Sequence, residues 1–315
     1  MADKKVAEQY YSPPPKLGKW EGFRQFLWNS ETSQFLGRTG SSWAKILFFY
    51  ICFYSALTGF FAAMLAVFYQ TLDNRMPKWQ QDNSLIGSNP GLGFRPMPPE
   101  SNVESTLVWY RASEGKNMEY WTKEIDNFLH EYRKNENVEN RVSCDYNNYP
   151  QEGKVCDVPV DNWTPCTADN KYNFHKSAPC IFLKLNKIYG WKPQYYNNTD
   201  VLPEKMPKDL KDHIASERGR NPKTMDTVWV SCEGENPADV ENMGAIQFIP
   251  RRGFPGFYYP FTNVDGYLSP LVAVYFERPK VGVLINIECK AWAQNIIHDR
   301  ADRRGSVHFE LMVDF

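Results

Sequence analysis

The stretch Ile46–Tyr69 reads ILFFYICFYSALTGFFAAMLAVFY and contains no charged residue. As an α-helix, 24 residues would extend about 36 Å, which is enough to cross a hydrocarbon core of about 30 Å. A cleaved signal peptide has a shorter apolar region close to the N-terminus, whereas 45 residues precede this stretch. The sequence therefore predicts an uncleaved membrane anchor.

The cysteines and the glycosylation sequons indicate the orientation of this anchor. Cys52 lies within the apolar stretch, and six further cysteines follow it: Cys144, Cys156, Cys166, Cys180, Cys232 and Cys289. Two sequons also follow it, at Asn162 and Asn197. Because disulfides and N-glycans are acquired on the oxidising side of a membrane, we expect a single-pass type II protein whose C-terminus is outside.

Composition divides the chain into four predicted parts. We expect a cytoplasmic tail over 1–45, a transmembrane helix over 46–72, a stalk over 73–105 and a glycosylated ectodomain over 106–315. The stalk is rich in Pro, Gly, Asn and Gln, which predicts an irregular chain. An aromatic segment of the tail, Trp20–Trp28, could be an interfacial helix.

The ectodomain is predicted to be mainly β. Lys116–Asn135 has apolar residues at helical intervals, which indicates one amphipathic helix. Eight short stretches are rich in β-branched and aromatic residues and are separated by turn residues. They are Thr106–Arg111, Lys154–Val160, Cys180–Leu185, Thr227–Cys232, Ala245–Ile249, Leu271–Phe276, Val283–Cys289 and Val307–Val313. This pattern favours an antiparallel β-sandwich with one helix and long loops over a doubly wound α/β domain.

Six cysteines allow 15 disulfide connectivities, and their spacing does not choose between them. Pairing of neighbours along the chain is the simplest arrangement. A zinc site is the rival interpretation, but no Cys-x-x-Cys spacing is present.

The sequence contains none of the motifs that would predict an enzyme. Type II glycoproteins include many glycosyltransferases, yet no Asp-x-Asp pair follows the anchor. No H-E-x-x-H, G-x-S-x-G, phosphate-binding or dinucleotide-binding motif occurs either. With 36 Lys plus Arg against 37 Asp plus Glu, no nucleic-acid partner is indicated. We therefore predict no catalytic residue, no metal and no cofactor.

The apolar stretch carries more pattern than an anchor requires. One stripe is aromatic and aliphatic, and consists of Tyr50, Phe53, Tyr54, Leu57 and Phe61. A second, adjacent stripe of small residues, Ser55, Gly59, Ala63 and Ala66, is of the kind that lets helices approach closely. These residues either face lipid or contact a partner helix, and two tyrosine hydroxyls in an apolar segment favour the partner.

Several segments together resemble the beta subunits of sodium/potassium-transporting ATPases. Before and within the anchor these segments are Phe26–Ser30, Phe35–Thr39, Ser42–Trp43 and Phe49–Tyr54. After it they are Cys180–Asn186, Tyr258–Pro260, Gly266–Val274 and Glu288–Ala293. The C-terminal segment looks most like invertebrate members. The tyrosine-rich signature departs from the family at Phe261–Asn263, which leaves the details of the outer interface open.

The resemblance implies an immunoglobulin-like β-sandwich and neighbour-paired disulfides, Cys144–Cys156, Cys166–Cys180 and Cys232–Cys289. It also implies that Tyr50, Phe53 and Tyr54 contact a late helix of a catalytic alpha subunit. We add Leu57, Gly59 and Phe61 as candidate contacts in the membrane. Outside the membrane, the tyrosine-rich signature makes Tyr258, Tyr259 and Pro260 candidate contacts with a partner.

By the same resemblance the chain is a non-catalytic subunit at the plasma membrane. It would stabilise the alpha subunit, carry it to the cell surface and modulate potassium affinity, and it lacks the Asp-Lys-Thr-Gly-Thr phosphorylation motif. Membrane lipid and a small single-span regulatory protein are further candidate partners. The alternatives are a cell-adhesion or junction glycoprotein, the beta subunit of a potassium/proton pump, and a type II ectoenzyme.

Overall fold

The computed structural model describes residues 18–99, 101, 105–133, 139–299 and 304–314. The chain divides into two compact units, Met1–Leu72 and Asp73–Phe315, and each is described by itself.

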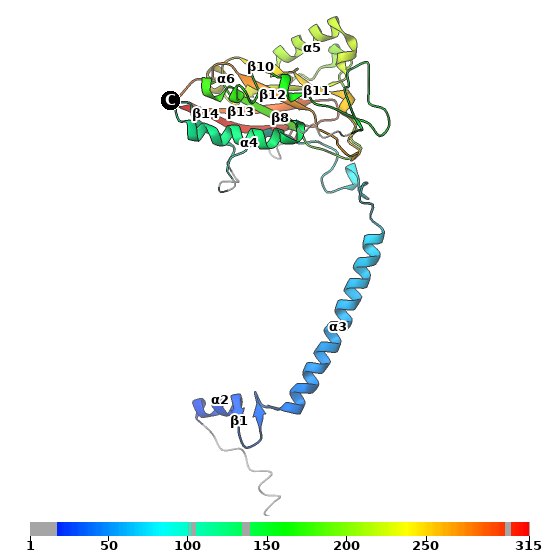
Figure 1. The fold of residues 1–315 in the computed structure, drawn as a ribbon, viewed down its shortest axis with the longest axis vertical. Helices are drawn as coiled ribbons and strands as arrows, with labels where there is room; N and C mark the ends of the chain where they lie inside the picture. The colour runs from blue at the N-terminus through cyan, green and yellow to red at the C-terminus, as the bar shows by residue number, and fades with distance from the viewer. Residues whose placement is uncertain (1–17, 100, 102–104, 134–138, 300–303, 315) are drawn as a thin grey trace, which may run out of the picture. The chain divides into compact units, whose positions relative to one another are not determined.

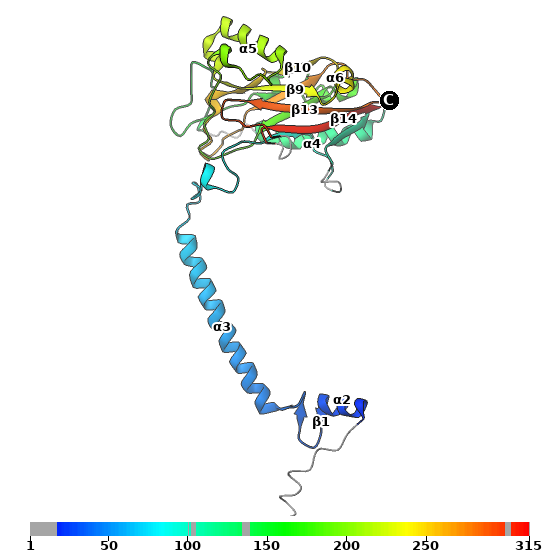
Figure 2. The ribbon, with the colours of Figure 1, turned by 180° about the vertical axis from the view of Figure 1, so that it is seen from behind.

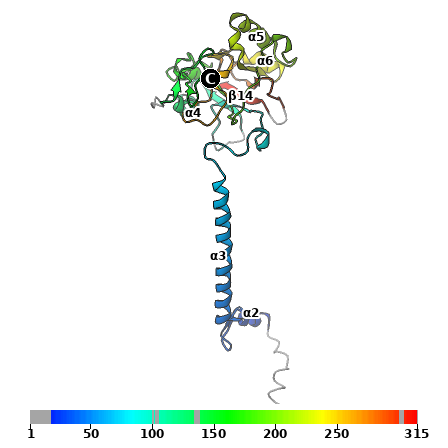
Figure 3. The ribbon, with the colours of Figure 1, turned by 90° about the vertical axis from the view of Figure 1, so that its right-hand side faces the viewer.

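From residue 18 onward, where the structure describes it, the N-terminal unit contains two helices separated by a small antiparallel sheet. Helix α2 (Lys19–Leu27) is followed by three two-residue strands, β1 (Trp28–Asn29), β2 (Gln34–Phe35) and β3 (Arg38–Thr39). Helix α3 (Gly40–Gln70) begins directly after β3 and is unbroken in Figure 3.

Helix α3 is the element expected to span a membrane. Among the described residues it is the one helix long and apolar enough to cross a bilayer, and none of its side chains is buried. It begins at Gly40, six residues before the predicted start at Ile46. At this end the Trp43 indole Nε1 donates to the carbonyl of Phe35 at 2.8 Å, which joins the small sheet to the helix.

The C-terminal unit is a sandwich of two sheets (Figures 1 and 2). The four-stranded sheet has the order β10-β12-β8-β4, with β10 Ile246–Ile249, β12 Leu271–Phe276, β8 Cys180–Leu185 and β4 Leu92–Arg95. The five-stranded sheet has the order β11-β9-β13-β14-β5, with β11 Gly253–Pro255, β9 Thr227–Gly234, β13 Leu284–Trp292, β14 Ser306–Asp314 and β5 Leu107–Arg111. The buried aromatic rings of Phe94 and Phe309 stack between the sheets, with centroids 5.0 Å apart.

Helix α4 (Gly115–Arg133) packs along the sandwich because its apolar residues recur on one face. Its buried residues are Met118, Trp121, Ile125, Leu129 and Tyr132. Two of them also make polar contacts. The Trp121 indole donates to the carbonyl of Trp109 at 2.8 Å, and the Tyr132 hydroxyl donates to the carbonyl of Ser269 at 3.1 Å. These bonds satisfy the polar atoms that burial removes from water.

Three disulfides cross-link the C-terminal unit: Cys144–Cys156, Cys166–Cys180 and Cys232–Cys289. These are the pairs that the family resemblance implies. Cys232 and Cys289 lie directly opposite each other on β9 and β13, in the middle of the five-stranded sheet.

The predicted mainly-β domain with one transmembrane helix is confirmed, but several details differ. Leu92–Arg95 lies within the predicted irregular stalk and instead forms an edge strand, because Leu92 and Phe94 alternate inward onto the core. Only Val155–Cys156 of the predicted strand 154–160 is extended. The sheets are not wholly antiparallel, since β5 runs parallel to β14.

Two helices were also missed, α5 (Lys208–Arg220) and α6 (Pro237–Met243). Helix α5 is mostly polar and buries only Leu210 and Ile214, so its hydrophobic periodicity is weak.

Truncating the helix–sandwich contact should destabilise the C-terminal unit. Ile125 is fully buried, so Ile125→Ala should lower the free energy of unfolding by about 2–5 kcal/mol. Asn127 is two residues further along the helix and is exposed, so Asn127→Ala should change the free energy of unfolding by less than about 0.5 kcal/mol. Denaturant titration of the full chain in detergent measures both values, and equal effects would contradict the assigned packing.

Removal of the central disulfide should also destabilise the unit. Its cysteines are 57 residues apart, and the chain-entropy model gives about 4 kcal/mol for closing a loop of that length. The double variant Cys232→Ala/Cys289→Ala should therefore melt well below the unaltered chain. Cys52→Ser is the control because Cys52 is a free cysteine in α3. An unchanged melting temperature of the double variant would refute this expectation.

Candidate functional site

The aromatic stripe of α3 is the first candidate site. The rings of Tyr50 and Tyr54 stack with centroids 5.9 Å apart, and Phe53 meets Tyr54 edge-on at 5.4 Å. About half of the surface of each of these three side chains is exposed. Leu57 and Phe61 continue the same face at helical spacing and are also exposed. The helix therefore presents a ridge of rings with no protein partner within the described residues.

Gly59 does not belong to this ridge. It follows Tyr50 by nine residues, which at 100° per residue places it half a turn round the helix. A Cβ atom built on Gly59 would meet no other atom within 4 Å. Of the six candidate contacts in the membrane, five share one face of α3 and Gly59 lies on the face of the small residues. The two stripes of the sequence are therefore opposite rather than adjacent.

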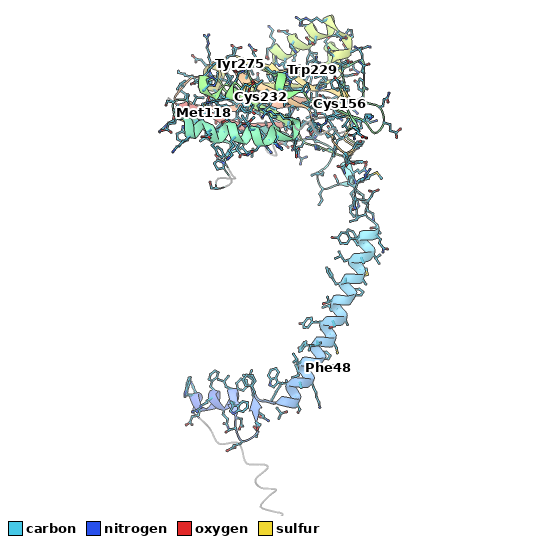
Figure 4. The ribbon with its side chains drawn as sticks, viewed as in Figure 1. Phe48, Met118, Cys156, Trp229, Cys232 and Tyr275 are labelled. Carbon is cyan, nitrogen blue, oxygen red and sulfur yellow. A yellow bond between two sulfur atoms is a disulfide. The ribbon has the colours of Figure 1, made fainter. Side chains whose placement is uncertain are left out.

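The tyrosine-rich signature borders a cavity of about 250 Å³ in the C-terminal unit. Tyr258, Tyr259 and Pro260 line it from the turn that follows β11, and Tyr267 lines it from a later loop. The segment from Tyr149 to Cys156, which lies about 100 residues earlier in the chain than Phe257, also lines the cavity. The Cys144–Cys156 disulfide holds one end of that segment. Figure 4 labels Cys156.

Hydrogen bonds hold these tyrosines in place. The Tyr258 hydroxyl donates to the carbonyl of Asp157 at 2.7 Å, and the Tyr267 hydroxyl donates to the carbonyl of Tyr258 at 3.2 Å. The Tyr259 ring lies edge-on to Trp191, with centroids 5.5 Å apart. The hydroxyl of Tyr259 and the indole nitrogen of Trp191 have no hydrogen-bond partner among the described residues. These tyrosines are thus fixed, and two of the polar atoms among them are unsatisfied.

The tyrosine hydroxyls around the cavity are neutral at physiological pH. Burial raises the pKa of Tyr258, Tyr259 and Tyr267 well above the ordinary value of a phenol. Partial burial and the neighbouring Asp226 carboxylate raise the pKa of Tyr149 to about 12. A neutral phenol both donates and accepts hydrogen bonds, so the tyrosine side of the cavity favours a polar, uncharged contact, whereas Glu152 and Lys154 bring charge to the facing segment.

Sequence reasoning assigned no role to Tyr267, Tyr149 or Trp191, although Tyr267 lies in one of the quoted motifs. The available signal was aromatic composition alone, which does not show which rings meet. The two predicted glycosylation sites, Asn162 and Asn197, are both exposed. The structure describes no group of three or more His, Cys, Asp or Glu side chains that could hold a metal ion within its described ranges.

The chain is similar to known ATPase subunits over almost its whole length. A family model described as sodium/potassium ATPase beta chain matches residues 14–309. The chain is 54% identical over 314 residues to sodium/potassium-transporting ATPase subunit beta-2 of Drosophila melanogaster, covering 98% of this chain and 96% of that protein. It is 38% identical over 302 residues to subunit beta-1 of the same organism, covering 95% of each chain.

More distant relatives follow the same pattern. The chain is 34% identical over 299 residues to a probable subunit beta-3 of Caenorhabditis briggsae, covering 93% of this chain and 87% of that protein. Because these matches extend through both structural units, the chain belongs to the sodium/potassium ATPase beta chain family.

Proposed function

We propose that this chain is the non-catalytic beta subunit of a sodium/potassium-transporting ATPase and binds a catalytic alpha subunit as a heterodimer. The observation that carries the proposal is the family match across both units, from residue 14 to residue 309. The alpha subunit would perform ATP hydrolysis and ion transport. The beta chain would stabilise it, carry it to the plasma membrane and modulate its potassium affinity.

The ridge of rings on α3 supports a contact within the membrane. Lipid tails are as apolar as leucine, so aromatic rings gain little from facing lipid and more from packing against another helix. Tyr50 and Tyr54 also carry hydroxyls, which in hydrocarbon need a hydrogen-bond partner. We therefore assign Tyr50, Phe53, Tyr54, Leu57 and Phe61 to the alpha subunit. Gly59, on the opposite face, is left for lipid or a small single-span regulatory protein.

The tyrosine cavity supports a second contact outside the membrane. Tyr149 lines the cavity, is exposed and carries a neutral hydroxyl, which suits a polar loop of the alpha subunit. The C-terminal unit would lie on the extracellular side, and the membrane would hold α3. Contacts at two depths would couple the outer loops of the alpha subunit to its ion path, which is how a subunit with no catalytic group could change potassium affinity.

Removing the rings of the ridge should weaken this heterodimer. The triple variant Tyr50→Leu/Phe53→Leu/Tyr54→Leu stays apolar but loses ring packing and both hydroxyls, so less alpha subunit should co-purify in mild detergent. Loss of about 1–3 kcal/mol corresponds to roughly 5- to 150-fold in affinity. The measurement is alpha subunit recovered per beta chain, together with sodium- and potassium-dependent ATPase activity in the eluate.

A matched control separates the ridge from hydrophobicity in general. Phe48→Leu removes an exposed ring that lies on the face opposite the ridge by helical spacing, and this variant should recover the alpha subunit normally. Figure 4 labels Phe48. Equal loss of alpha subunit recovery in both variants would contradict the assignment of the ridge to the alpha-subunit contact. Full recovery without ATPase activity would count against the pump subunit itself.

Glycan attachment tests the proposed orientation. Asn162→Gln and Asn197→Gln should each raise gel mobility by one step, because each removes one glycan from a lumenal sequon. Asn127→Gln, which changes an asparagine outside any sequon, should leave mobility unchanged. A chain whose mobility is unaffected by either sequon variant or by deglycosylation would place the C-terminal unit on the cytoplasmic side.

A further inference from the structure

Strand β10 forms one edge of the four-stranded sheet, and among the described strands it pairs with β12 alone. The register of this pair shows which main-chain groups of β10 are used. Glu277 donates from its backbone N–H to the carbonyl of Ala245 at 3.0 Å, so the hydrogen-bonded pairs of the ladder begin at Ala245. In an antiparallel ladder, hydrogen-bonded and non-hydrogen-bonded pairs alternate. The main-chain N–H and C=O groups of Gln247 and Ile249 therefore also point toward β12.

The N–H and C=O groups of Ile246 and Phe248 therefore point away from β12. Within the described residues no hydrogen bond engages these main-chain groups. Two residues at alternate positions thus offer two donors and two acceptors in the arrangement that a further strand would pair with. An exposed edge of this kind is a template for another chain.

The two edges of the five-stranded sheet are closed by local contacts. Along β5, the outward N–H of Leu107 donates to Ser105 Oγ at 3.1 Å, the carbonyl of Trp109 accepts from Trp121, and the N–H of Arg111 donates to Asn117 Oδ1 at 3.3 Å. In β11, the N–H of Gly253 donates to the carbonyl of Arg251 at 2.9 Å, and Pro255 has no N–H. These are the devices by which proteins protect sheet edges.

The opposite edge of the four-stranded sheet is also restricted. Strand β4 lies between Pro90 and Pro96, and its Phe94 carbonyl accepts from Arg95 Nη1 at 2.8 Å. Strand β10 itself, Ile-Gln-Phe-Ile, contains no charge and no proline, but Pro250 follows it directly and the Arg252 guanidinium lies over the Phe248 ring, 4.9 Å from its centroid. Neither of these residues bonds to the outward main-chain groups of Ile246 and Phe248 within the described residues, and in this β10 differs from the other three edges.

A cleft of about 500 Å³ lies beside this edge. Its other wall is α5, which contributes Asp209, His213 and Glu217, one residue in every four, from a single face. Both opposite views place β10 next to α5 (Figures 1 and 2), and Figure 4 labels Trp229 below that helix. Trp229 lines the cleft, is 3% exposed, and its indole nitrogen has no hydrogen-bond partner among the described residues.

Most of the charge at the cleft is already compensated. Asp209 pairs with Arg252 at 2.6 Å, and Glu217 pairs with Arg220 at 3.4 Å. Arg251 lies over the ring of Tyr146, 4.7 Å from its centroid. The cleft therefore offers free main-chain groups and little unpaired charge. That combination fits the backbone of an uncharged extended peptide better than a charged ligand.

We propose that the cleft between β10 and α5 binds an extended segment of another polypeptide, which adds to β10 as a fifth strand of the four-stranded sheet. The segment exchanges main-chain hydrogen bonds with Ile246 and Phe248. Its alternate side chains enter the cleft beside the buried Trp229 ring. Affinity comes from backbone pairing and apolar burial.

The test uses the full-length chain in lipid nanodiscs and a displayed library of random ten-residue peptides. The most enriched peptide is then synthesised and used as the probe. Its binding should slow hydrogen exchange at the amides of Ile246 and Phe248 by about tenfold or more. The amides of Gln247 and Ile249, which β12 already engages, should change much less. Affinity should fall less than about threefold between low and physiological salt.

A pair of variants isolates the backbone contribution. Ile246→Pro removes one outward N–H and leaves the bonds to β12 in place, so the probe should bind about tenfold more weakly. Ile246→Val keeps the N–H and should bind within about twofold of the unaltered chain. If Ile246→Pro does not fold, the exchange pattern of the unaltered chain decides alone.

Three results would overturn the proposal. They are a library that enriches no peptide protecting these two amides, a probe whose binding depends steeply on salt, and protection of both amides by self-association without peptide. The last result, detected by sedimentation at increasing protein concentration, would make a second copy of this chain the occupant instead.

Discussion

The main-chain hydrogen bond is the interaction on which both units of this protein depend. In a hydrocarbon core no water is available to an N–H or C=O group, so a single segment can cross only as a helix that satisfies these groups internally. The 31 residues of α3 meet that condition without interruption. Because the backbone is satisfied internally, the side chains of α3 are free to specialise, with the ridge of rings on one face and the small residues concentrated on the other.

In the C-terminal unit the same requirement acts at the borders of two sheets. The interior strands satisfy one another, and the core between them is closed by aromatic pairs such as Phe94 with Phe309. The edges need other solutions, and the chain uses side-chain donors, a tryptophan from α4 and proline. The functional surfaces proposed for this unit lie where such solutions are incomplete. The outer edge of β10 is one such place, and the buried Tyr259 hydroxyl and Trp229 indole lie beside the tyrosine cavity and the β10 cleft.

The sequence was sufficient to predict the elements whose residues repeat strongly. The apolar run of α3, the buried face of α4 and the long strands β8, β9, β12, β13 and β14 all follow from periodicity. Strand β4 was missed because flanking prolines and glycines indicate loop, while its pairing with β8 is set by residues about 90 positions later in the chain. Helix α5 was missed because it buries only two side chains.

The candidate sites show the same division. Helical spacing alone groups Tyr50 with Phe53, Tyr54, Leu57 and Phe61, and it also excludes Gly59 from that group. The tyrosine cavity could not be predicted from sequence. Its lining comes from two segments separated by 100 residues of chain, one ending at Cys156 and the other beginning at Phe257. Only the fold shows that the Cys144–Cys156 loop and the tyrosine signature meet.

The parallel pairing of β5 with β14 has a consequence for biosynthesis. Leu107–Arg111 is the first strand of the five-stranded sheet to leave the ribosome, yet its neighbour Ser306–Asp314 is the last. Until that last strand is translated, β5 has no ladder to join and β13 is paired on one side only. The sheet therefore closes after nearly all of the domain has been translated, as a contact of very long sequence separation. Translation that stops before β14 yields a chain with an open sheet, which quality control can distinguish from a finished subunit.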